Sequence, residues 1–437
     1  MMIKNYDFEN VPIADIVDEI IVDSVRRNAS DIHFDQKEDE LLIRIRIDGE
    51  LINYTIVPNN VRKNLITRIK IISNMNITES RLPQDGAIKK TIDGLNLDMR
   101  VSSLPTSYGE KIVIRILDYS KSLEGLETLG FSQENLERVR KIISVPNGII
   151  LVTGATGTGK STTVYSILQK LNTEDRNIIT VEDPIEMRIE GINQVQVISE
   201  IGLTFGNALR SILRQDPDII MIGEIRDDET ARIAVRASIT GHLVLSTIHT
   251  NNSLNTIERL LDMDVERYLL GSALTGIISQ KLARQLCPEC RKLRKTTEYE
   301  KNVFKIALGK EVNEIYDAVG CEKCHNGYFG RIAIHEVLAI NQEVKDAIVL
   351  NIRKNELRKL VYKSDVTTML QDGLEKVMEG KTTFEEILKI IDLEDDLQGY
   401  EEIKLEQTLN DSKNALESTE TLNVNENNSN NLELFEL

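Results

Sequence analysis

The sequence has no run of about 18 apolar residues, the length that a membrane-spanning helix requires. Its opening stretch, MMIKNYDFENVPIADIVDEI, is acidic and lacks the apolar core of a signal peptide. We therefore expect a cytoplasmic protein without membrane insertion. Any role at the inner face of the plasma membrane would have to come through partner proteins.

Tryptophan is absent, and only 4% of the residues are aromatic. Positive charge is also scarce, because the chain carries a net charge of −17. Residues 391–437 hold thirteen acidic residues and two lysines, so −11 of this charge lies there and −6 in the other 390 residues. Without a basic field or aromatic platforms, the chain is poorly suited to direct contact with nucleic acid.

The segment 391–437 is also rich in asparagine. Such a composition cannot bury enough apolar surface to offset the entropy of the chain, so we predict a disordered, solvated tail. A docking segment is the alternative, because the end of the tail is apolar. Its apolar residues are Leu432, Leu434, Phe435 and Leu437.

The first 118 residues carry the patterns of a small α+β domain. Apolar spacing predicts amphipathic helices at 12–27 and at about 59–73. Alternating residues around Asp48-Gly49 and Asp93-Gly94 predict two hairpins with primed turns, and KIVIRIL predicts a closing strand. The polar, glycine-containing residues 119–130 are then expected to form a linker.

Residues 131–390 show a different pattern, of short apolar runs separated by helical stretches. The runs lie in GIILVTG, NIITVEDP, DIIMIGE and HLVLSTIHT. Continuous apolar runs indicate strands buried on both faces, hence a parallel sheet in an α/β domain. Because ligands bind beyond the carboxyl ends of such strands, we expect the residues just after the four runs to form one site.

The stretch GATGTGKST at 154–162 fits the pattern G-x-x-x-x-G-K-[ST]. Its glycines let backbone N–H groups face phosphate oxygens, its lysine reaches the β- and γ-phosphates, and its hydroxyl ligates Mg²⁺. A helix that begins near Ser161 would direct its positive end at the same anion. The predicted residues for ATP and Mg²⁺ are Gly154, Thr156, Gly157, Thr158, Gly159, Lys160, Ser161 and Thr162.

Acidic residues and histidines border the other runs. Glu182 and Asp183 could activate an attacking water, although a turn or capping pair before a proline is the alternative. Glu224 ends its run at a usual place for a partner of Mg²⁺. His242 and His249 flank one buried strand that reaches the same edge of the sheet, and they are either catalytic or structural residues.

The four cysteines form the pattern C-x₂-C-x₃₀-C-x₂-C, at Cys287, Cys290, Cys321 and Cys324. Two tight turns of this kind can close a tetrahedral shell around one metal ion. Zinc is favoured over an iron–sulfur cluster or unmetallated thiols, in a structural insert at about 284–330. Disulfides are not expected in a cytosolic chain.

The four site motifs resemble a known family. GATGTGKSTT, TVEDPIE, LRQDPDIIMIGEIRDDETA and TGHLVLSTIHTN resemble the Walker A, Asp box, Walker B and His box of the secretion-motor ATPases, which drive type II secretion and type IV pilus assembly. Upstream, ASDIHF, RIRIDGEL, RLPQDGAI and MRVSSLPTSYGEKIVIRIL resemble the family's second N-terminal domain. The resemblance covers residues 12 to about 390. It implies a RecA-like P-loop domain, a homo-hexameric ring and a membrane-embedded platform protein as partner.

The resemblance also implies roles for the matching acids and cations. Lys160 and Ser161 would hold phosphate and Mg²⁺, Glu182 would be the general base, and Glu224 would hold Mg²⁺ through water.

By the same resemblance, His249 and His242 would sense the γ-phosphate, and arginines of the N-terminal domain would neutralise charge on the transferring phosphoryl group. The candidate arginines are Arg81, Arg100 and Arg115. Ala87 stands where many relatives have an arginine after PQDG.

Two other functions stay open. A translocase or helicase would need basic, aromatic-bearing loops, which this composition disfavours. A nucleotide-gated scaffold would not need Glu182 and Glu224. Because only about ten residues precede the second domain, the chain resembles the short competence-pilus motors as much as the secretion motors. The sequence does not distinguish secretion, pili and DNA uptake.

Overall fold

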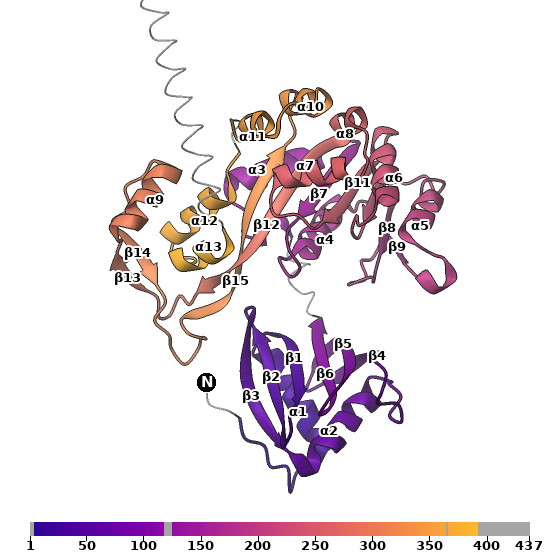
Figure 1. Cartoon of the computed structure of the whole chain (residues 1–437), viewed down its shortest axis with the longest axis vertical. Helices are drawn as coiled ribbons and strands as arrows, with labels where there is room; N and C mark the ends of the chain where they lie inside the picture. Colours follow the sequence, from indigo (N-terminus) through magenta and orange to yellow (C-terminus); the bar gives the residue numbers. More distant parts are fainter. Residues whose placement is uncertain (1–3, 118–124, 364–365, 392–437) are drawn as a thin grey trace, which may run out of the picture.

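The structure is a computed structural model, and it describes residues 4–117, 125–363 and 366–391 (Figure 1). Residues 392–437 of the predicted tail and residues 118–124 of the predicted linker lie outside the described residues.

The N-terminal unit, residues 4–117, contains one antiparallel sheet. Its strands are β1 (Ala29–Gln36), β2 (Glu40–Ile47), β3 (Glu50–Pro58), β4 (Gln84–Ile92), β5 (Leu95–Thr106) and β6 (Gly109–Leu117), in the order β3-β2-β1-β6-β5-β4. Both predicted turns have φ of 50° at Asp48 and Asp93, with positive φ at the glycine that comes next. The two hairpins and the closing strand are therefore confirmed.

Two helices pack on one face of this sheet. They are α1 (Ile13–Arg26) and α2 (Asn59–Ile72), within a residue or two of the predicted ranges. Their apolar residues meet those of alternate strand positions, such as Ile32 and Phe34, in one buried core.

The P-loop unit, residues 125–391 as far as they are described, contains a seven-stranded sheet. Its strands are β7 (Gly148–Thr153), β8 (Ile178–Glu182), β9 (Asn193–Gln196), β10 (Ile219–Ile222), β11 (Leu243–Ile248), β12 (Leu274–Leu286) and β15 (Tyr328–Ala339), in the order β15-β12-β7-β11-β10-β8-β9. All neighbouring strands are parallel except β15, which is antiparallel to β12. The predicted parallel sheet in an α/β unit is thus confirmed.

Helices cover both faces of this sheet, as continuous apolar strands require. One face carries α3 (Gln133–Ile143) and α4 (Lys160–Leu171). The other carries α5 (Phe205–Ile212), α6 (Asp228–Ile239), α7 (Ser253–Asp262) and α8 (Arg267–Ala273), with α10 (Gln342–Val349) and α11 (Lys354–Lys363) packed beside them.

The strands β12 and β15 extend beyond the sheet as a two-stranded ribbon, because β12 pairs with β7 only as far as Ser279. A smaller core forms around this ribbon. It is built from β13 (Lys292–Lys295), α9 (Glu298–Leu308), β14 (Glu314–Asp317), α12 (Met369–Met378) and α13 (Phe384–Ile390).

The end of the predicted linker is part of the P-loop unit. A short 3₁₀ turn at Leu126–Thr128 places Leu126 in the core beside α4, where it is 2% exposed. The prediction of a linker as far as residue 130 is therefore wrong. The polar composition of the segment concealed two apolar side chains, Leu126 and Leu129, that pack together.

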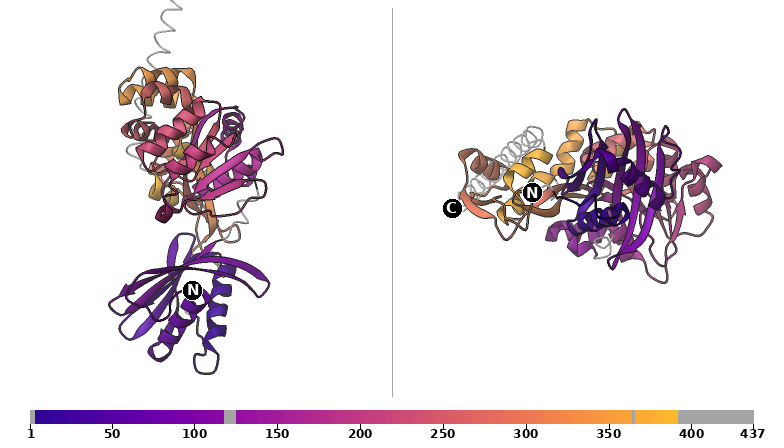
Figure 2. Two further views of the ribbon diagram at one scale, coloured as in Figure 1. Left: turned by 90° about the vertical axis from the view of Figure 1, so that its right-hand side faces the viewer. Right: turned by 90° about the horizontal axis from the view of Figure 1, so that it is seen from below.

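The N-terminal unit lies at one end of the P-loop unit (Figures 1 and 2). Between the described residues of the two units, hydrogen bonds and ion pairs form at two places. Arg100 of β5 contacts the residues after β8, and the turn between β2 and β3 contacts the start of β15 and the far end of β12.

Candidate nucleotide-binding and metal sites

The phosphate loop joins β7 to α4, as the sequence predicts. Gly154 has φ of 153°, and a Cβ there would lie 2.4 Å from the carbonyl oxygen of Gln280. Gly159 has φ of 87° and caps α4. Side chains are thus excluded where the loop passes closest to β12 and where it enters the helix.

The ammonium group of Lys160 lies across its own loop. It donates hydrogen bonds to the carbonyl oxygens of Gly154 (2.8 Å) and Ala155 (3.0 Å), and the residue is 8% exposed. Burial lowers the pKa of Lys160 from its ordinary value, and the charge of Glu224 opposes that shift. A cation held only by neutral carbonyls is suited to receive phosphate oxygens, which are stronger acceptors.

The first turn of α4 completes the phosphate site. Ser161 is exposed at the start of this twelve-residue helix, whose N-terminal N–H groups carry positive partial charge. Cation, hydroxyl and helix end therefore fit a nucleoside triphosphate with its Mg²⁺.

One residue of this loop's support was not anticipated from the sequence. Gln280 of β12 is 1% exposed, donates to the carbonyl oxygen of Thr158 (2.7 Å) and accepts from the hydroxyl of Thr163 (2.8 Å). Its amide thus ties the loop to the first turn of α4. No local pattern marks it, because the contact depends on β12 lying beside β7.

Glu182 ends β8 and is 2% exposed. Its Oε1 accepts from the hydroxyl of Thr180 (2.5 Å) and the amide of Gln194 (3.1 Å), while its Oε2 accepts from the hydroxyl of Tyr165. The three donors were not predicted. Thr180 is a neighbour on β8 itself, whereas Tyr165 of α4 and Gln194 of β9 reach the carboxylate only through the tertiary fold.

Glu224 lies just beyond β10 with two nitrogen-bearing partners, Arg226 and His249. Its Oε1 is paired with Arg226, and its Oε2 lies 3.4 Å from Nε2 of His249. Burial alone would raise the pKa of Glu224, but hydrogen bonds and charge from Arg226 and His249 hold that pKa below its usual value. The carboxylate is therefore ionised near Lys160, as a partner of Mg²⁺ must be.

His242 does not lie at this edge. It precedes β11, and its carbonyl oxygen accepts from the N–H of Gly148 at the start of β7. β11 lies between it and His249, seven residues on, so the two histidines are about 23 Å apart at about 3.3 Å per residue. Within this chain, His242 therefore lies away from the phosphate loop, where the γ-phosphate role that the resemblance implied finds no support, because a parallel strand brings to that edge only the residues at its carboxyl end.

The candidate arginines occupy different positions. Arg100 contacts the segment after β8, with its Nη2 2.8 Å from the carboxylate of Glu186 and 3.2 Å from the carbonyl oxygen of Ile185. Arg81 is 86% exposed and pairs with Glu79. Arg115 pairs with Asp31 on the sheet of the N-terminal unit. Among these arginines, the structure brings only Arg100 to the P-loop unit.

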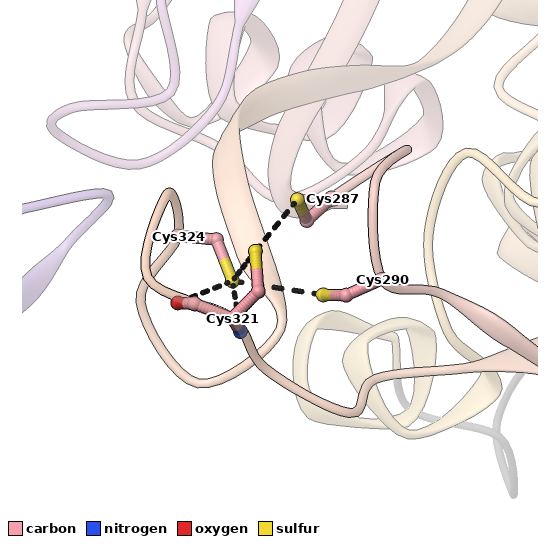
Figure 3. Close-up of side chains that lie close together, drawn as sticks. All are labelled: Cys287, Cys290, Cys321 and Cys324. Atoms are coloured by element: carbon pink, nitrogen blue, oxygen red, sulfur yellow. Dashed lines mark hydrogen bonds between the residues drawn. The ribbon is translucent and has the colours of Figure 1, made fainter.

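The four cysteines converge although they come from two distant turns (Figure 3). Their sulfur atoms all lie within 4.8 Å of one another, with separations of 3.9 Å for Cys287–Cys321, 3.7 Å for Cys290–Cys324 and 3.6 Å for Cys321–Cys324. Four thiolates around one ion at a bond length of about 2.3 Å would be about 3.8 Å apart. The site therefore fits one tetrahedral metal ion.

His325 comes directly after Cys324 but is directed to the N-terminal unit. Its Nε2 lies 3.5 Å from Glu50, whose carboxylate also binds Arg284 at 2.5 Å. The neighbouring N–H of Gly330 donates to Asp48 (2.9 Å). The turn between β2 and β3 is thus seated beside the cysteine site.

A phosphate loop between β7 and α4, faced by carboxylates at the ends of β8 and β10, defines a P-loop ATP hydrolase. The family described as "Type II/IV secretion system protein" matches residues 7–389, and the chain belongs to this family. The resemblance found in the sequence is confirmed.

Similar proteins include a type II secretion system protein E from Aeromonas hydrophila, 44% identical over 386 residues that cover 87% of this chain and 76% of that protein. The type IV pilus assembly ATPase PilB of Thermus thermophilus is 43% identical, over 85% of this chain and 42% of its own. Among solved structures, the pilus retraction motor PilT with ADP has a TM-score of 0.59 at 27% identity, covering 86% of this chain and 96% of that chain. The ATPase DotB of Legionella pneumophila, at 23% identity, TM-score 0.65 and coverage of 88% and 97%, supports the fold alone. Within the described residues, each helix is too short or too polar to cross a membrane.

Proposed function

We propose that this chain is the ATPase of a machine that assembles a type IV pilus or a type II secretion pseudopilus. It would act as a homo-hexameric ring on the cytoplasmic side of the inner membrane and transmit movement through a membrane platform protein. The observation that carries the proposal is the placement of Lys160, Glu182 and Glu224 at one edge of a parallel sheet, in a chain of this family. Assembly, rather than retraction, is supported by the protein E and PilB relatives.

ATP would be held by the loop N–H groups and by Lys160, whose ammonium would exchange its carbonyl partners for phosphate oxygens. Ser161 would hold Mg²⁺ directly, and Glu224 would hold it through water. The bound ion supplies charge neutralisation between the β- and γ-phosphates. His249, paired with Glu224, would contact the γ-phosphate.

Glu182 would accept the proton of the attacking water. Its three donors leave about one of its four lone-pair positions free, so withdrawal of a donor would make more room for the water. Arg100 would move from Glu186 to the γ-phosphate when the N-terminal unit closes, and there it would offset the charge that develops in the transition state. The cysteine site would hold Zn²⁺ as a structural clip.

The test uses the purified full-length chain with Lys160→Ala as the inactive control. Light scattering with a non-hydrolysable ATP analogue should give a hexamer, and ATP turnover should rise with protein concentration as the ring forms. Turnover should not change on addition of single- or double-stranded DNA. A severalfold stimulation by DNA would favour the translocase, and full turnover in a stable monomer would contradict the ring.

A further inference from the structure

The carboxylate of Glu182 has little capacity left for a water molecule. A carboxylate offers about four lone-pair positions, and the donors Tyr165, Thr180 and Gln194 occupy three of them. The residue is 2% exposed. In this arrangement Glu182 is oriented and shielded rather than presented to solvent.

The donor Tyr165 differs from the other two in what it touches next. It lies on α4 five residues after Lys160, is 1% exposed, and its hydroxyl oxygen accepts the backbone N–H of Glu186 at 3.1 Å. A phenol has one proton, so this hydroxyl donates to Glu182 while it accepts from Glu186. Burial, together with the charge of Glu182, raises the pKa of Tyr165 and keeps that proton in place.

Glu186 in turn binds the N-terminal unit. Its carboxylate lies 2.8 Å from Nη2 of Arg100, which also donates to the carbonyl oxygen of Ile185 at 3.2 Å. A series of contacts thus runs from Arg100 to the side chain of Glu186, and from the backbone N–H of Glu186 through the Tyr165 hydroxyl to Glu182. Both Arg100 and Glu186 are about one-third exposed, so this outer contact can break without unfolding the core.

We propose that Tyr165 is a positioning residue that keeps Glu182 in reserve while Arg100 is bound to Glu186, and that departure of Arg100 makes Glu182 available. The inference rests on the proposed function, in which Glu182 is the general base. When Arg100 leaves, the segment at 185–186 loses its outer anchor, and its N–H can move away from the Tyr165 hydroxyl. Hydrolysis would then be slow while Arg100 stays on Glu186, and it would speed up once closure of the N-terminal unit carries Arg100 to the γ-phosphate.

The central experiment is a double-mutant cycle on the full-length chain, with Tyr165→Phe and Arg100→Ala measured alone and together. Tyr165→Phe removes one donor to a charged acceptor and leaves the ring in the core. Loss of such a hydrogen bond changes the equilibrium between the bound and the free carboxylate about tenfold. We expect kcat to rise at least about threefold with KM for ATP unchanged. We also expect Arg100→Ala to lower kcat more in the Tyr165→Phe background than in the wild type, because only in the wild type does loss of Arg100 also release Glu182.

The matched control is Tyr54→Phe, which removes a buried hydroxyl 2.6 Å from Asp23 in the N-terminal unit and should leave kcat unchanged. If Tyr165→Phe fails to fold, Glu186→Gln tests the proposal in its place, because Glu186 is partly exposed and this change only weakens its ion pair with Arg100. It should also raise kcat. An unchanged or lowered kcat in the deciding variant, or equal effects of Arg100→Ala in both backgrounds, would overturn the proposal.

Glu182→Gln distinguishes failure of this proposal from failure of the proposed function, in which Glu182 is the general base. If Glu182→Gln loses turnover while Tyr165→Phe behaves as wild type, only the reserve mechanism fails. If Glu182→Gln keeps near wild-type turnover, Glu182 is not the base and both proposals fail.

Discussion

Replacing Gln280 by leucine should weaken ATP binding although the residue need not touch the nucleotide. Leucine has a similar size but cannot hydrogen bond, so it leaves the Thr158 carbonyl and the Thr163 hydroxyl without their partner. The hydroxyl can turn to the carbonyl of the preceding helical turn, as threonines in helices do. The Thr158 carbonyl belongs to the loop itself and cannot turn to another hydrogen-bond donor in this way.

The size of the effect can be worked out from that one carbonyl. An unpaired buried polar group costs about 1–3 kcal/mol, and every 1.4 kcal/mol changes an equilibrium constant about tenfold. Because the loop binds phosphate only in its held conformation, we expect the Kd for a non-hydrolysable ATP analogue to rise between about fivefold and about a hundredfold. Isothermal titration calorimetry measures this directly.

Gln371→Leu is the matched control, because it removes a glutamine amide from the carbonyl oxygen of Ala307 at 3.2 Å, far from the loop. It should lower the melting temperature without changing the Kd. Thr163→Val combined with Gln280→Leu should cost less than the sum of the two single changes, since both act through the same amide. A wild-type Kd in a folded Gln280→Leu protein would refute the idea that this amide holds the loop.

Three further changes test other parts of the molecule. Lys160→Ala should abolish ATP turnover, and mixing it into wild-type protein should depress activity more than in proportion to its fraction; a proportional loss would indicate independent subunits. Freshly purified protein should contain about one zinc per chain by metal analysis, and Cys290→Ser should lose the metal and melt earlier while ATP binding persists; iron, or no metal in reduced protein, would contradict this. His335 is fully buried and stacked on Phe131, and burial, with the charge of Lys376, lowers the pKa of His335 well below its ordinary value. Below about pH 6.5 the histidine takes up a proton in the unfolded chain but not in the folded chain, so the free energy of unfolding falls by about 1.4 kcal/mol per pH unit as the pH decreases. In calorimetric melting, His335→Phe should therefore lose less stability in acid than the wild type. Identical slopes would refute the assignment.

The sequence was sufficient for features that depend on neighbours along the chain. The parallel strands, the phosphate loop and both primed turns could be predicted from local patterns, because apolar runs and turn residues act over a few positions. Direction along a strand was equally available, and it would have separated His242 from His249. The four cysteines could be grouped because the pattern itself carries the geometry of the ion.

Contacts between strands that are distant in the sequence could not be predicted in this way. Gln280 reaches the loop because β12 lies next to β7, and Gln194 reaches Glu182 because β9 lies next to β8. Neither placement can be read from periodicity, which sets the faces of a strand but not its neighbours. The same limit applied to Arg81, Arg100 and Arg115, which only the arrangement of the two units tells apart.

The ribbon of β12 and β15 is fixed at one end in the sheet and reaches the N-terminal unit with its other end, so it can act as a lever. Its root is fixed in the sheet beside Ser279, and Gln280, the first residue past that root, holds the phosphate loop. Farther out, Arg284 grips Glu50 of the N-terminal unit, and Cys287 begins the metal site about 23 Å from Gln280, at about 3.3 Å per residue. A tilt of about 5° at the root would displace the outer end by about 2 Å, over the same strand length. Small adjustments around bound phosphate are therefore magnified at the point where the two units meet, and the bound metal ion would keep that outer end stiff enough to carry the load.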